Sequence, residues 1–284
     1  MPAFARLSLS QAQFDKKFGD DFCQRLPTSP GIYRFYDARG ELIYVGKAKN
    51  LRQRLQSYRN AGRKKKEKKQ RLLTKEAQRI EFEVLASEEE ALLTEARLIQ
   101  EKKPTYNIQC AYDFLYPAIG CGSWDAHLLL SFSNQPAPFS SLNLSWFGVF
   151  RSRPRAKLAF TSLEFLLAHL GHQEQRNRLP QVQNPRGSRL IGFRQLPTSI
   201  QETLPWYLAG TEADLLSELA HHLLRKPAAR RRAEEVQMHL TQLKHFYQTD
   251  TQQLRRELQA TGRPGSFVAS TERDQLHIRA NFAK

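Results

Sequence analysis

Residues 31–50 read GIYRFYDARGELIYVGKAKN, and this stretch decides the fold of the N-terminal part of the chain. Two runs of aromatic and β-branched residues, 32–36 and 42–45, are separated by a short loop that contains Gly40. Such runs joined by a glycine-containing loop predict a β-hairpin. Asn50 is a favourable N-cap residue, so a helix over residues 51–58 is expected to follow the hairpin directly.

Farther along, the sequence predicts a third strand and another helix. Residues 80–84 read IEFEV, and this alternation with a period of two is typical of a half-buried strand. Ser87 and Glu90 form a capping box that begins a helix, which Pro104 ends. Because the strands come as a hairpin plus one, the expected fold class is α+β. It comprises a small three-stranded antiparallel sheet flanked by helices, not a parallel doubly wound sheet.

The remainder of the chain is expected to form a mixed, mainly helical C-terminal region. A strand is predicted at residues 143–150, a short helix at 162–170, and a longer helix at 212–224 that Pro227 interrupts. A helical stripe of apolar residues follows and predicts the second arm of an αα-hairpin, used either for packing or for binding a partner. The residues of this stripe are Val236, Leu240, Leu243, Tyr247, Leu254 and Leu258.

The charge of the chain points to an anionic partner. Lys and Arg number 44 against 28 Asp and Glu, which gives a formal net charge of +16 at pH 7. Nucleic acid is the commonest partner of such a basic chain, and phosphate contacts make its binding strongly dependent on salt. The alternative is that the charge serves only solubility.

Cysteine usage and hydropathy favour a cytoplasmic protein. The chain has 3 cysteines, none of them in a C-x-x-C pair or near a histidine at zinc-finger spacing. Neither a disulfide framework nor a structural zinc site is therefore expected. No apolar run approaches the ~18 residues of a membrane span. Residues 1–20 also lack the apolar core of a signal peptide.

One carboxylate lies where the amphipathic pattern of its helix requires an apolar side chain. The neighbours of Glu95 three and four positions away are Ala91, Leu92, Leu98 and Ile99, all of them apolar. An ionised carboxylate on such a face is costly unless it is paired, protonated or bound to a metal. From the residues alone, a structural ion pair with an arginine is favoured over a metal site.

Other chemically capable side chains are expected near the same edge of the sheet. Arg54 shares a helical face with apolar residues and therefore points inward. Lys47 directly follows the end of a strand, beside a helix start, where it is well placed to meet a phosphate. Tyr33 and Tyr44 lie on paired strands. The alternatives are an ordinary surface lysine and two core-forming tyrosines.

Together these residue types suit hydrolysis of a phosphodiester. The reaction needs a deprotonated nucleophile, neutralisation of the negative charge on the phosphoryl oxygens and stabilisation of the leaving oxygen. Mg²⁺ held by one carboxylate can supply the electrostatics, because this ion takes few protein ligands and keeps its waters. A tyrosine titrates near ~10, so a tyrosine base would need neighbouring cations. The candidates for these neighbouring cations are Lys47, Arg54 and the metal.

Motifs in a fixed order give the sequence a specific resemblance to a known family. They are LPTSPGIY (26–33), IYVGKAKNLRQR (43–54), EALLTEARLI (90–99) and PTYNI (104–108). Over residues 26–116 the chain resembles the GIY-YIG nuclease family. Within that family it is similar to the branch that contains UvrC, the nuclease subunit of bacterial nucleotide excision repair, and its shorter relative Cho.

The resemblance implies a role for each residue of the motifs. Tyr44 corresponds to the general base that acts on water, and Tyr33 and Lys47 to partners that position or polarise it. Arg54 corresponds to the cation that contacts the scissile phosphate. Glu95 corresponds to the sole protein ligand of one Mg²⁺ or Mn²⁺ ion.

Further residues are expected to contact the substrate. The resemblance implies that Tyr58 is an active-site aromatic residue and that Asn107 is an amide that orders the substrate. Basic side chains around the site are expected to bind the DNA backbone, the alternative being a solvated helix face or a mobile loop. These side chains are Lys49, Arg52, Arg63, Lys64, Lys65, Lys66, Lys68 and Lys69.

The expected domains follow from the extent of the resemblance. An N-terminal extension is expected at residues 1–25 and the GIY-YIG endonuclease domain at 26–116. An irregular α/β region at 117–200 and a helical region with a short tail at 201–284, a candidate for partner binding, are expected to follow. The middle region of UvrC has clustered cysteines, but residues 171–194 contain none, so no metal cluster is expected there. Given the length of the chain, the second nuclease and helix-hairpin-helix domains of UvrC are not expected.

The function that the resemblance implies is incision of damaged DNA on the 3′ side of a lesion during nucleotide excision repair. UvrB is the expected protein partner, and no nucleotide cofactor or membrane is expected. One alternative is a GIY-YIG endonuclease of a mobile-element or restriction type, although no sequence-reading module is recognisable. Another alternative is a non-catalytic DNA-binding adaptor, which would bind DNA without cutting it.

Overall fold

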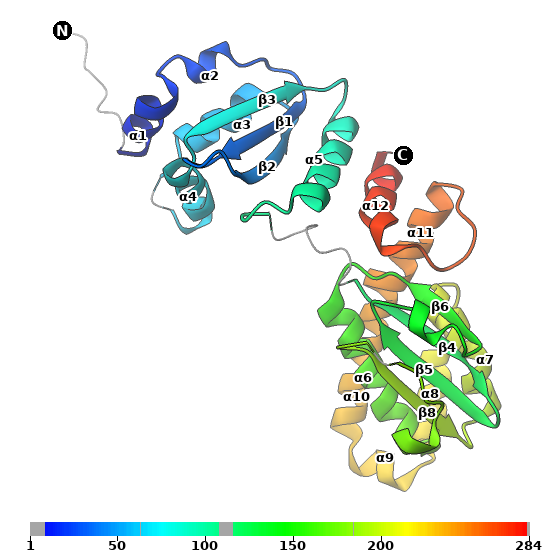
Figure 1. Ribbon diagram of the computed structural model, residues 1–284. Coiled ribbons are helices and arrows are strands. Elements are labelled where there is room, and N and C mark those ends of the chain that lie inside the picture. Colours follow the sequence, from blue (N-terminus) through cyan, green and yellow to red (C-terminus); the bar gives the residue numbers. More distant parts are fainter. Residues whose placement is uncertain (1–8, 63, 108–115, 184, 283–284) are drawn as a thin grey trace. The chain divides into compact units, whose positions relative to one another are not determined.

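The structure, a computed structural model, describes residues 9–62, 64–107, 116–183 and 185–282 (Figure 1). The chain divides into two compact units, Met1–Tyr112 (unit 1) and Asp113–Lys284 (unit 2). The motifs of the GIY-YIG resemblance therefore lie in unit 1, while unit 2 contains the mixed C-terminal region. None of the described helices combines the length and the hydrophobicity that crossing a bilayer requires.

The centre of unit 1 is a three-stranded antiparallel sheet flanked by helices, which confirms the predicted fold class (Figure 1). Its strands, in the spatial order β2-β1-β3, are β1 (Gly31–Tyr36), β2 (Leu42–Ala48) and β3 (Arg79–Val84). Strand β1 pairs with both others, and this pairing places Tyr33 opposite Gly46. A Cβ atom on Gly46 would lie 2.4 Å from the Tyr33 hydroxyl, so a glycine is required for the ring to lie there.

Two helices of unit 1 begin at the predicted caps. They are α3 (Leu51–Arg59) and α5 (Glu88–Lys102), whereas α4 (Lys68–Glu76), which follows the short 3₁₀ helix η1 (Lys65–Glu67), has no side-chain cap. The Asn50 side chain accepts a hydrogen bond from the N–H of Gln53 over 2.9 Å. The Ser87 hydroxyl accepts one from the N–H of Glu90 over 3.1 Å. These caps satisfy N–H groups that the first turn of a helix leaves without partners, so these two helices start where the sequence predicts.

The N-terminal segment is an integrated part of unit 1. Its described residues form α1 (Leu9–Phe18) and α2 (Phe22–Arg25). The Phe14 side chain is fully buried in the core of unit 1. Arg59 of α3 donates hydrogen bonds to both carboxylate oxygens of Asp15, at 2.6 and 2.8 Å. The segment expected as an extension thus contributes to the packing that holds α3.

Unit 2 is built on a five-stranded antiparallel sheet in the order β6-β4-β5-β8-β7 (Figure 1). The strands are β4 (Ala118–Trp124), β5 (His127–Ser133), β6 (Leu144–Gly148), β7 (His172–Gln173) and β8 (Arg189–Arg194). Short 3₁₀ turns lie at η3 (Ala137–Phe139), η4 (Arg176–Arg178) and η6 (Ser270–Glu272). The predicted strand at 143–150 corresponds to β6. The strands form a regular sheet where an irregular region was expected.

Helices make up most of the rest of unit 2, as predicted. They are α6 (Arg153–Ala168), α7 (Thr198–Ala209), α8 (Asp214–Leu224), α9 (Pro227–Arg231), α10 (Ala233–Phe246), the π-helical turn η5 (Tyr247–Thr251), α11 (Gln252–Ala260) and α12 (Arg273–Phe282). The short helix expected at 162–170 begins earlier, because Ser152 caps α6 through the N–H of Arg155. Pro227 separates α8 from α9, as expected for a residue that cannot continue a helix.

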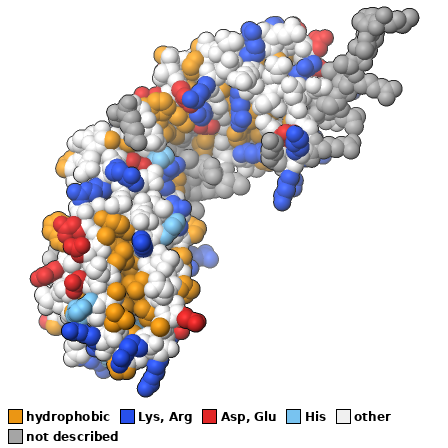
Figure 2. Space-filling view, turned by 180° about the vertical axis from the view of Figure 1, so that it is seen from behind, with side chains coloured by type: hydrophobic (Ala, Val, Ile, Leu, Met, Phe, Trp, Pro, Cys, Tyr) orange, Lys and Arg blue, Asp and Glu red, His pale blue; other side chains and the backbone are white. Residues whose placement is uncertain are grey.

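The apolar stripe of the C-terminal helices is used mainly for packing inside unit 2. Leu243, Leu254 and Leu258 are buried in the main hydrophobic core of the unit. Val236 and Leu240 pack against that core and also line an apolar groove of about 280 Å³ between α8 and α10. Figure 2 shows hydrophobic side chains gathered in a band on one face of unit 2. Binding of a partner by this region remains a prediction.

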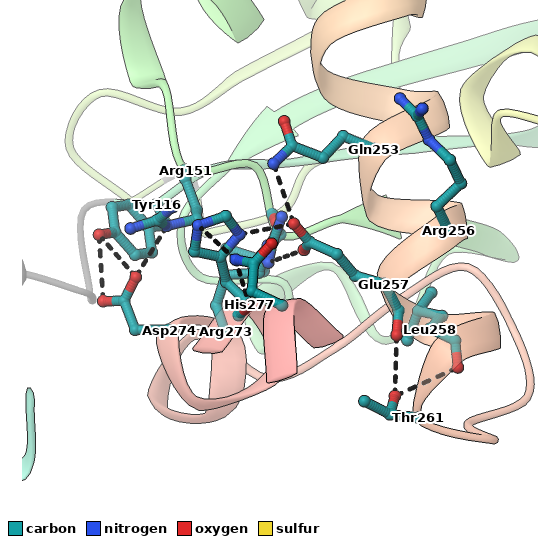
Figure 3. Close-up of polar contacts among 12 residues, drawn as sticks. Tyr116, Arg151, Gln253, Arg256, Glu257, Leu258, Thr261, Arg273, Asp274 and His277 are labelled. Carbon is teal, nitrogen blue, oxygen red and sulfur yellow. Dashed lines mark hydrogen bonds and ion pairs between the residues drawn. The ribbon is translucent and has the colours of Figure 1, made fainter. Parts of the chain in front are cut away.

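A buried polar network fastens the last helix to the body of unit 2 (Figure 3). The Arg273 side chain is 3% exposed, and its Nε donates to the carbonyl of Val149 over 2.8 Å. Its Nη1 lies 2.6 Å from a carboxylate oxygen of Glu257, and His277 Nδ1 lies 2.6 Å from the other oxygen. Nearby, Asp274 accepts hydrogen bonds from Arg151 and Tyr116. The network joins α12 to α11 and to the segment that follows β6.

Candidate active site

The residues singled out from the sequence converge on one cavity of unit 1. It has a volume of about 520 Å³ and lies beside the paired strands β1 and β2, between α3 and α5. The predicted residues that line it are Tyr33, Tyr44, Lys47, Lys49, Arg54 and Glu95. The hairpin supplies the tyrosines and Lys47, α3 supplies Arg54, and α5 supplies Glu95. Three consecutive segments, β1, β2 and α3, thus combine with the more distant α5 in a single polar site.

A chain of hydrogen bonds orients the aromatic side of the site. The Arg54 Nε donates to the Tyr33 hydroxyl over 2.9 Å, and the Tyr33 and Tyr58 hydroxyls lie 3.0 Å apart. Burial raises the pKa of both Tyr33 and Tyr58 well above that of a free tyrosine. Both hydroxyls are therefore protonated at neutral pH and act as hydrogen-bonding groups. Tyr44 remains as the cavity-lining tyrosine that the resemblance implies to be the base.

Glu95 lines the cavity as a carboxylate with cations nearby but no ion pair among the described residues. Its Oε1 accepts a hydrogen bond from the backbone N–H of Lys47 over 3.1 Å. Burial raises the pKa of Glu95, while the hydrogen bond and the charges of Lys47, Arg54 and Lys69 act in the opposite direction. Among the described residues this carboxylate forms no ion pair, so the arginine pairing that the sequence alone favoured is wrong.

Lys47 is held by an acidic residue that the sequence analysis did not single out. Its Nζ lies 2.9 Å from Glu88 Oε1, and the Nζ of Lys49 lies 2.8 Å from Glu88 Oε2. The hydrogen bonds from Lys49 and Lys47 lower the pKa of the Glu88 carboxyl. Glu88 therefore bridges two cations at the rim of the cavity. The sequence feature that could have indicated this role is the position of Glu88 in the first turn of α5, since the lysines at the end of β2 need an acidic partner.

Asn107 does not line the cavity and instead stabilises the edge of the sheet. Its Nδ2 donates to the carbonyl of Val45 over 2.8 Å, and its Oδ1 accepts from the N–H of Val45 over 2.9 Å. Strand β2 lies at an edge of the sheet, so the outward backbone groups of the buried Val45 need partners. The structure thus shows Asn107 as a support for β2, and contact with substrate remains a prediction.

Replacing Asn107 with Ala is expected to destabilise the protein by about 2–4 kcal/mol, because a buried donor and a buried acceptor lose their partners. Urea denaturation measures the loss. The matched control is Asn60→Ala, at an exposed asparagine of the same unit, which is expected to change stability by less than about 1 kcal/mol. Equal effects of the two substitutions would contradict the supporting role.

The basic residues predicted to bind DNA differ in their surroundings. The exposed members are Lys49, Arg52, Lys64, Lys65, Lys68 and Lys69. Arg63 lies outside the described residues, as does the side chain of Lys66. Arg52 and Lys69, although exposed, also make contacts within unit 1. Figure 2 shows Lys and Arg side chains scattered over one face of unit 1.

Arg52 and Lys69 make specific contacts within unit 1. The Arg52 Nε donates to the carbonyl of Leu26 over 2.7 Å and so ties α3 to the segment before β1. The Lys69 ammonium lies 4.6 Å from the centroid of the Tyr44 ring. Lys69 therefore contacts a residue of the cavity. The sequence does not distinguish it from the neighbouring lysines.

Comparison with known proteins finds similarity in the same part of the chain. The family model described as "UvrC-like GIY-YIG domain" matches residues 29–108. The UvrABC system protein C of Hahella chejuensis is 46% identical over 124 residues, which are 43% of this chain and 19% of that protein. The corresponding protein of Koribacter versatilis is 50% identical over 94 residues, which are 33% of this chain and 15% of that protein. The chain thus spans less than a fifth of the length of these relatives.

A solved structure is similar over the same region. It is the GIY-YIG N-terminal endonuclease domain of UvrC from Thermotoga maritima, bound to its catalytic divalent cation, magnesium. The sequence identity is 36%, and the similarity covers 34% of this chain and 97% of that one, with a TM-score of 0.28.

Proposed function

Because unit 1 of this chain belongs to the UvrC-like GIY-YIG family, we propose that the protein is a metal-dependent endonuclease that incises damaged DNA on the 3′ side of a lesion in nucleotide excision repair. The observation that carries the proposal is the meeting of Tyr44, Arg54 and Glu95 on one cavity. This set provides a base, a phosphate-binding cation and a metal ligand without a nucleophilic side chain of the protein.

The residues present fit one hard divalent cation. Glu95 offers a carboxylate that faces the cavity, has a raised pKa because of burial, and among the described residues has no ion pair. No group of three or more His, Cys, Asp or Glu side chains gathers for metal binding in the described part of the chain. Mg²⁺ and Mn²⁺ accept such a site, since Mg²⁺ needs few carboxylates and keeps several waters. When bound, the ion supplies positive charge to the phosphoryl oxygens.

Each side chain of the cavity has its own role in the proposed reaction. Tyr44, acting as the phenolate, accepts the proton of the attacking water and becomes the neutral phenol. Arg54 contacts an oxygen of the scissile phosphate, and the hydroxyl of Tyr33 keeps its guanidinium in that orientation. Tyr58 supports the hydroxyl of Tyr33 in turn. Lys47, paired with Glu88, adds positive charge beside the metal ligand.

The DNA partner and the protein partner follow from the same proposal. The exposed side chains of Lys49, Lys64, Lys65 and Lys68 contact the phosphates of the duplex around the site. The relatives are components named for the UvrABC system, and UvrB is accordingly the protein that would present the lesion to this chain. The helical region at 201–284 is the segment that we propose for that contact.

The decisive experiment is incision of an end-labelled duplex that carries one lesion and has been loaded with UvrA and UvrB. With Mg²⁺ present, we expect a single nick on the 3′ side of the lesion and none in undamaged DNA. Cutting of undamaged DNA at a defined sequence would favour a restriction-type or mobile-element enzyme. Salt-sensitive binding without incision in Mg²⁺ or Mn²⁺ would favour a non-catalytic adaptor.

Replacing Tyr44 with Phe tests the base. The substitution is expected to lower the incision rate by about 10²–10⁴-fold, the usual contribution of a general base, while DNA binding is retained. The matched control is Tyr36→Phe on strand β1, because Tyr36 does not line the cavity. Rates are measured with the lesion duplex and binding by gel shift. Retained incision in the Tyr44 variant would remove this residue as the base.

A further inference from the structure

A second cavity adjoins the candidate active site. It has a volume of about 530 Å³ and lies between α3 and the η1–α4 segment. Tyr44, Arg54 and Ser57 line both cavities, so the two are lobes that meet at a shared wall. The first lobe contains the metal ligand Glu95. The second lobe, called here the α3–α4 lobe, is formed beyond the shared wall by Tyr58, Asn60, Glu67, Lys69 and Gln70.

Lys69 places a cation at the junction of the two lobes. Its ammonium lies over the face of the Tyr44 ring, 4.6 Å from the centroid, where the aromatic quadrupole attracts it. Burial lowers the pKa of Lys69, and the positive charge of Arg54 lowers it further, while Glu95 opposes the change. Lys69 and Arg54 both line the α3–α4 lobe, so two cations face the same cavity. Such a juxtaposition is unfavourable by itself and is relieved when an anion binds between them.

The polar groups of the α3–α4 lobe are held in place by their own contacts. The Gln70 Nε2 donates to the Ser57 hydroxyl over 3.1 Å, and that hydroxyl donates to the carbonyl of Arg54 over 2.6 Å. Glu67 is an acidic member of the lobe, and its Oε2 accepts the N–H of Gly62 over 2.6 Å. This bond holds the carboxylate on the loop before α4. The wall that contains Ser57 and Gln70 is thus ordered before any ligand arrives.

From this geometry we infer that the α3–α4 lobe binds the nucleotide next to the scissile phosphate, with Lys69 contacting that neighbouring phosphate. The inference rests on the proposed endonuclease function. The lobe volume lies within the range of about 300–1,000 Å³ that is typical of sites for small ligands, so it can hold a nucleotide and not only an ion. Ser57, Asn60 and Gln70 supply uncharged hydrogen-bonding groups for the sugar and the base edge.

Lesion duplexes with a neutral methylphosphonate at single positions test this inference. The methylphosphonate replaces, in turn, the phosphate on either side of the scissile one and a phosphate several nucleotides away. For the wild-type protein, we expect one of the two neighbouring replacements to lower the incision rate by about 10- to 100-fold, the effect of losing one charge-assisted hydrogen bond. The distant replacement is expected to have little effect.

The variant Lys69→Gln identifies the protein partner of that phosphate. It should lose about the same 10- to 100-fold on the unmodified duplex and little more on the sensitive methylphosphonate duplex, because the same contact is already missing. The control is Lys75→Gln, which removes an exposed lysine near the end of the same helix. Equal behaviour of the two variants, or additive losses for Lys69→Gln, would overturn the inference. Failure of the wild-type protein to incise any duplex would instead overturn the proposed endonuclease function.

Discussion

Replacing Glu95 with Gln is expected to lower the incision rate by about 10³-fold or more, because a divalent ion supplies several kcal/mol of charge stabilisation in phosphodiester hydrolysis. The same substitution should raise the stability of the metal-free protein. Glu95 is a carboxylate whose pKa is raised by burial, and among the described residues it lacks an ion pair. A neutral amide of similar shape removes that unfavourable charge while its oxygen can still accept the N–H of Lys47.

Thermal unfolding with and without Mg²⁺ separates the two effects of this substitution. Mg²⁺ should raise the melting temperature of the wild-type protein, because an ion that binds only the folded state stabilises it, and should not raise that of Glu95→Gln. The matched control is Glu101→Gln, at an exposed glutamate of the same helix, which should keep both incision and the response to Mg²⁺. Undiminished incision by Glu95→Gln would remove Glu95 as the metal ligand.

Much of unit 1 could be predicted because its local signals and its tertiary packing agree. The hairpin of β1 and β2 follows from two aromatic and β-branched runs around one loop, and Asn50 and Ser87 mark the helix starts. Glu95 was found because the period of a helix puts it on the same face as the buried Ala91 and Ile99. A charge on an apolar face is an exception that a single sequence can reveal.

The sheet of unit 2 was harder to predict, because glycines interrupt its strand signals. Strand β4 reads AIGCGSW, and glycine is usually unfavourable in a strand. The structure explains Gly120 and Gly122 through neighbours that are distant in sequence. A Cβ on Gly120 would lie 3.2 Å from the Trp146 ring, and one on Gly122 would lie 2.0 Å from the carbonyl oxygen of Asn143. These close approaches to the β6 region favour glycine, and they exist only in the folded sheet.

Lys69 and Asn107 show a second limit of sequence analysis. Lys69 belongs to a dense run of lysines, and only the turn through η1 into α4 returns it to the face of Tyr44. Asn107 was expected at the substrate because of the motif around it. Its hydrogen bonds to Val45 depend on β2 being an edge strand, a property of the sheet order that residue types do not encode.

Replacing Arg273 with Met is expected to destabilise unit 2 by about 3–5 kcal/mol, the effect of removing one partner from a buried ion pair. The change would leave the buried Glu257 without its arginine and the carbonyl of Val149 without its donor. Chemical denaturation followed by circular dichroism measures the loss. The control is Arg263→Met, because Arg263 pairs with Glu272 at the surface and such pairs contribute about 1 kcal/mol or less.

The acid sensitivity of unit 2 provides an independent measure of the same contact. Burial alone raises the pKa of Glu257, but the hydrogen bond from His277 and the charge of Arg273 outweigh it and lower the pKa to about 2. A carboxyl group whose pKa is lower in the folded than in the unfolded state stabilises the fold above its unfolded pKa, near ~4.3. That contribution is lost as the pH falls from there towards the folded value. Unfolding of the wild-type protein between these pH values should therefore depend more steeply on pH than unfolding of Arg273→Met. An unchanged pH dependence in the variant would mean that Arg273 does not set the charge state of Glu257.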